Sequence, residues 1–186
     1  RLHSIAERSA GRCRFQFLKD ISCNAGVQRP LRFSKWISDR EVLSVPWLNN
    51  EYHLHFQDGL FQIVICKESG LQNHVNSPSD ESDYLSQSFM DALSPLCYDM
   101  ICGVFGHRLC CLLNYENSPA QISTVSATLK RLFQQLPVKQ NLQFGCPFTM
   151  GIGQPVSSPA MLLQTLRSAS ICLDQRFLYG AGHVFS

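Results

Sequence analysis

The chain has 186 residues, of which 45% are hydrophobic and only 16% are charged, and its 16 basic and 14 acidic side chains leave a formal net charge of +2. The basic residues form no stripe that could follow a phosphate backbone, so this segment is not expected to bind nucleic acid itself. No apolar run approaches the ~20 residues that span a bilayer, and no signal-peptide pattern opens the chain. We therefore expect a cytoplasmic protein without membrane contact.

Residues 1–58 are predicted to form an N-terminal helical arm or linker. Phe15, Leu18 and Ile21 recur at a helical spacing. Ser38 and Glu41 match a capping box, in which each side chain satisfies a free backbone donor. A second helix is expected to begin there and to be broken or kinked at Pro46.

His53 and His55 close this region as an H-x-H pattern. In a strand, both imidazoles would share one face as two metal ligands, with Asp58 nearby. Because no third ligand is visible, we favour the interpretation that they are two partly exposed histidines beside a turn.

The pattern changes to alternating strands and helices from residue 59 onward. Strands are predicted over 60–66, 99–105, 108–115, 144–152 and 182–185. Helices are predicted over 85–96, from Ser118 to just before Pro137, and from Ser158 to Gly180. Residues 69–83 are expected to form an exposed loop, and Gly106–His107 a hairpin turn.

This order predicts an α+β domain over 59–186, with helices packed on a mixed sheet. Leu109–Leu113 is apolar on both sides, so both sheet faces should be covered. Gly151 and Gly153 form a G-x-G, which we interpret as a bend at a strand end and not as a dinucleotide site. The charges Arg167, Asp174 and Arg176 are expected on a solvated face of the last helix, where they could also meet a partner.

The nine cysteines include no C-x-x-C pair and mostly lie in apolar runs. We expect reduced core thiols, with Cys13 and Cys23 as an alternative redox-active pair if basic neighbours lower their pKa. The nine are Cys13, Cys23, Cys66, Cys97, Cys102, Cys110, Cys111, Cys146 and Cys172.

Three segments, GLFQIVICK (59–67), GIGQP (151–155) and LRSASICLDQRFLYGAGHV (166–184), resemble the central domain of AraC-type two-component response regulators, a degenerate GGDEF domain. The resemblance covers roughly residues 47–186. It implies a nucleotide-cyclase-like fold with a ferredoxin-like core.

In the active cyclases of this family, acidic residues at the first strand and the hairpin hold magnesium for phosphoryl transfer. The matching positions here are Lys67-Glu68-Ser69 and Phe105–Leu109, where only Glu68 is acidic. The resemblance therefore implies no metal, no cofactor and no enzymatic activity.

Two functions follow from the resemblance. The first is a signal-coupling domain in transcription regulation, which links a receiver domain to a helix-turn-helix domain, both outside this chain, and reaches DNA only through the latter. The alternative is a sensor that binds a nucleotide or another anion at Lys67, His107 and Arg108.

A homodimer is also predicted, because charge is scarce and several strands look buried on both sides. It would form through the N-terminal arm or a covered sheet face. Alternatively, residues 1–58 fold back over the sheet and leave a monomer.

Overall fold

The computed structural model describes residues 43–68, 78–105, 108–139, 148–180 and 182–186. The chain divides into two compact units, 1–39 and 40–186, and every described residue belongs to the second. The helix expected around Phe15 to Ile21 lies outside the described residues, and the domain boundary after residue 58 stays a prediction. Within the described residues, no helix combines the length and the apolarity needed to cross a membrane.

Helix α3, Val45–Tyr52, corrects the expectation for Pro46. Pro46 lies in the first turn of this helix, which begins at Val45. A missing N–H breaks no helical hydrogen bond there, so the proline is compatible with the helix and does not break it. Ser44 is the N-cap, and its Oγ accepts a hydrogen bond from the Trp47 backbone N–H at 3.4 Å. Residues 43 and 44 are not helical, so a helix starting at Ser38 does not continue into α3.

The two histidines of the H-x-H pattern follow α3 and do not lie in a strand. His53 adopts the left-handed conformation, with φ 53°, as the residue that ends α3. Both side chains are exposed, as the favoured interpretation predicted. The backbone N–H of His55 donates to Asp99 Oδ2 at 2.7 Å. Among the described residues, no three His, Cys, Asp or Glu side chains are grouped so that they could hold a metal ion.

The core of the fold is a five-stranded mixed sheet with the order β2-β3-β1-β4-β5. The strands are β1 Leu60–Glu68, β2 Asp99–Phe105, β3 Arg108–Tyr115, β4 Phe148–Ile152 and β5 Val184–Phe185. Pairing is antiparallel except between β4 and β5, which are parallel. The predicted hairpin is confirmed with its bounds, because β2 and β3 pair from Asp99 with Asn114 to Phe105 with Arg108.

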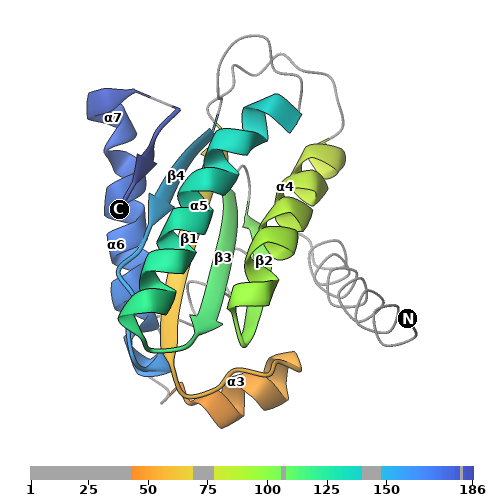
Figure 1. Ribbon diagram of the computed structural model, residues 1–186, viewed down its shortest axis with the longest axis vertical. Coiled ribbons are helices and arrows are strands. Elements are labelled where there is room, and N and C mark those ends of the chain that lie inside the picture. The colour runs from red at the N-terminus through yellow and green to blue at the C-terminus, as the bar shows by residue number, and fades with distance from the viewer. Residues whose placement is uncertain (1–42, 69–77, 106–107, 140–147, 181) are drawn as a thin grey trace. The chain divides into compact units, whose positions relative to one another are not determined.

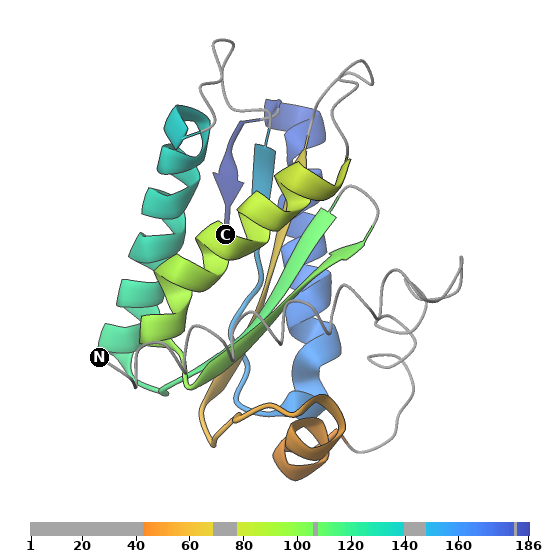
Figure 2. The same ribbon diagram turned by 90° about the vertical axis from the view of Figure 1, so that its right-hand side faces the viewer.

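Helices cover both faces of this sheet (Figures 1 and 2). Helices α4 and α5 lie on one face, where Phe89 and Leu129 join a buried cluster with Val64 and Cys111. Helix α6 packs on β1 and β4 from the opposite face. Residues 109–113 of β3 are all buried, which confirms that both faces are covered. The helical bounds are α4 Pro78–Leu93, η1 Ser94–Leu96, α5 Pro119–Lys139, η2 Pro159–Met161, α6 Leu162–Asp174 and α7 Arg176–Tyr179.

Several predicted boundaries are wrong. Residues 78–83 belong to α4 and not to the exposed loop, since Pro78 suits a first helical position and the acidic Asp80 and Glu81 suit a first turn. Helix α5 runs through Pro137 to Lys139. A proline there removes one hydrogen bond near the helix end, whereas the buried Leu136 holds the last turns against the core.

The last predicted helix is also divided. Its first turn is the 3-10 helix η2, and a turn at Gln175 separates α6 from α7. Strand β4 is described from Phe148 to Ile152, and its predicted start at residue 144 lies outside the described residues. Strand β5 is shorter than predicted and spans Val184–Phe185.

Gly151 and Gly153 are explained by close packing of α6 on β4. A Cβ at Gly151 would lie 2.3 Å from the Ala169 carbonyl oxygen, and one at Gly153 would lie 2.3 Å from the Thr165 carbonyl oxygen. Neither glycine has a positive φ. Contact with α6, and not a bend in the strand, therefore requires glycine at both positions.

Six of the nine cysteines lie in the described residues, and all six are free thiols. Their predicted place in the apolar core is confirmed for the four that are buried, while the other two are half-buried. The buried ones are Cys66, Cys102, Cys110 and Cys111, and the half-buried ones are Cys97 and Cys172. Cys13, Cys23 and Cys146 lie outside the described residues.

Candidate ligand-binding site

Two of the three residues predicted to line a ligand pocket lie next to each other at one end of the sheet. Lys67 near the end of β1 is the register partner of Arg108 at the start of β3. Directly opposed residues on antiparallel strands have Cβ atoms ~5 Å apart and share a face. Lys67 is half-buried and Arg108 is exposed. The third predicted residue, His107, lies outside the described residues.

These two side chains belong to the α6 face of the sheet. Cys66, which precedes Lys67, is part of the cluster under α4 and α5. Successive residues of a strand point to opposite faces, so Lys67 points to the side on which α6 packs. On that side its other register partner is the buried Thr149 of β4.

Arg176 adds a third cation, which the sequence pattern had assigned to a solvated helix face. It is the first residue of α7 and is half-buried. Its guanidinium carbon lies 4.7 Å from the centroid of the Phe177 ring, a cation–π contact. Its Nε is buried and, within the described part of the chain, has no hydrogen-bond partner.

Electrostatics connect the three cations. Burial lowers the pKa of Lys67 below its usual value, and the positive charges of Arg176 and then Arg108 lower it further. The negative charge of Asp174 raises the pKa of Lys67 and so partly opposes these effects. The lowered pKa means that the charged form of Lys67 is less favourable here than in water, and an anion bound beside it would offset this effect. The three side chains supply charged hydrogen-bond donors that suit phosphate or carboxylate oxygens.

Three thiols of the described core have raised pKa values. Burial, followed by the nearby Cys102, raises the pKa of Cys97 and of Cys110 to about 12. The same two causes, with a hydrogen bond to Cys102, raise the pKa of Cys111. A thiol attacks as the thiolate, which is scarce at neutral pH when the pKa is so high. These cysteines therefore serve packing.

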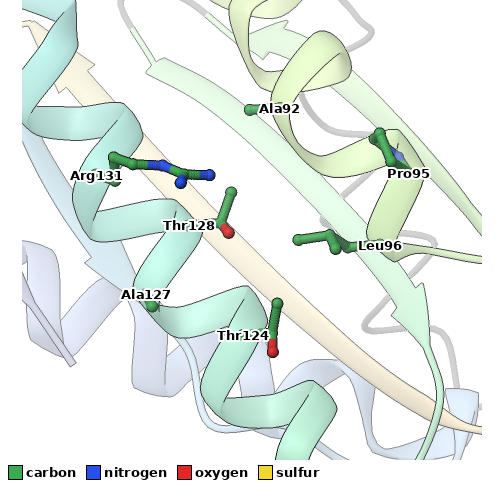
Figure 3. Close-up of a pocket in the computed structure, with 7 residues that line it drawn as sticks. All are labelled: Ala92, Pro95, Leu96, Thr124, Ala127, Thr128 and Arg131. Carbon is green, nitrogen blue, oxygen red and sulfur yellow. The ribbon is translucent and has the colours of Figure 1, made fainter.

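A groove lies between α4 and α5, on the opposite face of the sheet (Figure 3). It is a groove of about 550 Å³ whose lining is apolar or neutral except for Arg131. Seven residues line it: Ala92, Pro95, Leu96, Thr124, Ala127, Thr128 and Arg131. With a single charged side chain, it offers less to an ionic ligand than the end of the sheet at Lys67.

The site and fold can be compared with known proteins. No protein-family model matches the chain, and no curated protein matches it. Among solved structures, the chain is similar to the active GGEEF domain of a diguanylate cyclase from Vibrio cholerae, with a TM-score of 0.53 and 12% sequence identity. The match covers 68% of this chain and 82% of that chain. At this identity the likeness establishes the fold alone, and it confirms the predicted α+β, nucleotide-cyclase-like class.

Proposed function

We propose that this chain is a non-catalytic regulatory domain that couples a receiver domain to a helix-turn-helix DNA-binding domain in an AraC-type bacterial response regulator. One observation carries the absence of catalysis. Where the resemblance places the metal-holding acids of active cyclases, Lys67 and Arg108 oppose each other across β1 and β3. Arg176 adds a third positive charge that acts on Lys67.

This charge pattern is opposite to the one that magnesium requires. Hard divalent cations are held by carboxylate and carbonyl oxygens, and the ion neutralises charge that develops on the phosphates. Three cations at this end of the sheet would repel such an ion and would attract phosphate oxygens without it. Nucleotide binding without turnover is therefore compatible with the site, whereas metal-assisted cyclisation is not.

The AraC-type context is supported by the last segment of the resemblance. The sequence Arg176-Phe177-Leu178-Tyr179-Gly180 forms α7 and the residue that ends it. Gly180 has φ 85°, a conformation that side chains with a Cβ rarely adopt. The arginine of the pattern takes part in the basic site, the group of three cations formed by Lys67, Arg108 and Arg176. The glycine ends the helix, so both positions have a physical role in this fold.

The alternative, an anion sensor, uses the same residues. The buried Nε of Arg176, which has no hydrogen-bond partner among the described residues, and the lowered pKa of Lys67 favour it, because an anion at this site could accept a hydrogen bond and offset the positive charges around Lys67. A sensor role and a coupling role are compatible, since a ligand at this site could change how the domain contacts its neighbours.

An activity assay tests the proposal. The purified chain, incubated with GTP and Mg²⁺ or Mn²⁺, should yield no cyclic dinucleotide, while an active GGEEF domain assayed in parallel should. Turnover by this chain that is lost in Lys67→Met would refute the non-catalytic assignment. The coupling role is tested separately by the gene, which should encode a phosphoacceptor domain upstream and a helix-turn-helix domain downstream.

A further inference from the structure

Exposed apolar side chains are concentrated in the last helical segment of the chain. Seven large hydrophobic residues are exposed in the described chain, and five of them lie between η2 and the end of α7. These five are Met161, Ile171, Phe177, Leu178 and Tyr179. Ile171 is 66% exposed and Leu178 is 81% exposed. Large exposed apolar patches are rare on monomeric proteins and commonly mark surfaces that contact another molecule.

The outward-facing residues of α6 and α7 form a regular line, here called the outer stripe. It consists of Gln164, Arg167, Ile171, Asp174 and Leu178, all exposed. Their spacing alternates between three and four residues, as in the contact seam of two paired helices. The opposite side of α6 is buried on the sheet through Leu162, Thr165, Ala169 and Leu173.

The turn between α6 and α7 does not interrupt this stripe. Gln175 keeps helical dihedral angles, with φ −58° and ψ −20°. Its carbonyl oxygen accepts hydrogen bonds from the N–H groups of Leu178 at 2.9 Å and Tyr179 at 3.0 Å. Leu178 therefore continues the line that begins at Gln164, along the side of the molecule where Figure 1 shows α6 and α7.

The outer stripe is complementary to itself in one orientation only. If a second copy runs antiparallel about a two-fold axis at Ile171, each Ile171 meets its own counterpart. Arg167 of each copy then faces Asp174 of the other, and Leu178 of each copy faces the exposed Gln164 of the other. In a parallel pair, Arg167 would face Arg167. Within one helix, Arg167 and Asp174 are two turns, about 10 Å, apart along the axis and too distant to pair.

We propose that the outer stripe of α6 and α7 is the docking surface for a second copy of this chain, in an antiparallel two-fold helix pair. A symmetric interface of this type needs the same patch on both subunits, and the stripe meets that requirement at Ile171 and in the pairing of Arg167 with Asp174. This interface differs from the two expected from the sequence, which were the N-terminal arm and a covered face of the sheet. The inference is independent of the proposed function and of the basic site.

Sedimentation equilibrium over a range of concentrations tests this interface in the full chain. The wild type should show a reversible monomer–dimer equilibrium. Arg167→Asp should weaken dimerisation ~tenfold or more, because two like-charged pairs then face each other across the axis. Ile171→Glu should abolish the dimer by placing two carboxylates at the two-fold axis. The double variant Arg167→Asp/Asp174→Arg should recover association, since it restores both pairs with reversed signs.

A matched control separates this interface from a general effect of charge. Lys130→Asp makes a comparable charge reversal at an exposed position on α5, and it should leave the dimer unchanged. Thermal unfolding of each variant shows whether the monomer is intact. The double variant also replaces Asp174, whose charge acts on Lys67, and so it could lose stability for a reason unrelated to the dimer. In that case the single variants Arg167→Asp and Ile171→Glu test the interface. A wild type that stays monomeric throughout, or a dimer that tolerates both substitutions, would overturn the proposal.

Discussion

Gly151 of β4 lies against the backbone of Ala169 in α6, so closely that a Cβ at position 151 would be 2.3 Å from the Ala169 carbonyl oxygen. The same Cβ would be 2.7 Å from the backbone nitrogen of Leu173. Backbone atoms of a buried helix cannot rotate away as a flexible side chain can. The separation of α6 from the sheet is therefore set by the absence of a side chain at this position.

Gly151→Ala is expected to destabilise the domain by about 2–3 kcal/mol, the upper part of the range for overpacked cores. Chemical unfolding followed by circular dichroism measures the change. Ser157→Ala, at an exposed position near the end of the same segment, should alter the free energy of unfolding by less than about 0.5 kcal/mol. Equal stability of Gly151→Ala and the wild type would mean that α6 is not packed this tightly.

Thr165→Val tests a second contact between α6 and the sheet. The Thr165 Oγ1 accepts a hydrogen bond from the Ile63 backbone N–H at 3.1 Å, and the residue is fully buried. Valine keeps the shape but leaves the N–H of Ile63 without an acceptor, a loss of about 1–3 kcal/mol in unfolding free energy. The control is Thr124→Val on the exposed face of α5, where the hydroxyl donates only to the Ala120 carbonyl of its own helix. That variant should be nearly neutral.

Local sequence patterns correctly predicted the strands at the centre of the sheet. They were poor at predicting where helices end and how α6 packs on the sheet. The β2–β3 hairpin follows from two apolar runs joined by too few residues for any other geometry, so both its strands were predicted with their bounds. Pro46 and Pro137 misled the prediction of helix ends, because proline is compatible with a first turn and burial decides whether a late proline ends a helix. The roles of Gly151 and Gly153 depend on α6, which comes later in the chain.

The candidate site was predictable only in part for the same reason. Lys67 and Arg108 could be brought together from the sequence, since strand pairing aligns them. Arg176 could not, because its electrostatic effect on Lys67 depends on where α7 lies in the folded domain. A charge on an amphipathic helix looks the same in sequence whether it faces solvent or a distant lysine.

The buried cysteine thiols should react slowly with a thiol reagent in the folded chain and completely in the denatured chain. The pKa of Cys110 is raised to about 12 by burial, so the thiolate is rare at neutral pH. Without reductant, a thiol reagent should label nearly all nine cysteines in denaturant. In the folded chain, Cys66, Cys102, Cys110 and Cys111 should be labelled last, as followed by peptide mass spectrometry. Two protected pairs in the denatured chain would contradict the assignment of free thiols.

Inorganic pyrophosphate should stabilise the folded chain if the basic site binds anions. A ligand that binds only the folded state raises the melting temperature with its concentration. Lys67→Met and Arg176→Gln should each reduce this shift, while Lys130→Met on α5 should not. Sulfate at equal ionic strength distinguishes a specific site from salt effects. An identical shift in all four proteins would exclude Lys67 and Arg176 as the binding residues.

The lowered pKa of Lys67 makes a prediction about pH that needs no ligand. Burial is the main cause, followed by Arg176 and Arg108. Below the folded-state pKa, Lys67 is protonated in both states, and its unfavourable charge in the folded state is fully present. Between the lowered folded pKa and the ordinary value of 10.5, the unfolded chain binds more protons, so stability should rise with pH.

Lys67→Met removes the charge and should melt higher than the wild type at pH 7, by a modest amount because the side chain is only half-buried. The difference should shrink as the pH approaches 10.5, while Lys130→Met should melt like the wild type at every pH. Thermal unfolding at several pH values measures the three curves. A Lys67→Met variant that is less stable than the wild type at pH 7 would show that Lys67 is held by a favourable partner, and the picture of uncompensated positive charge at this end of the sheet would be wrong.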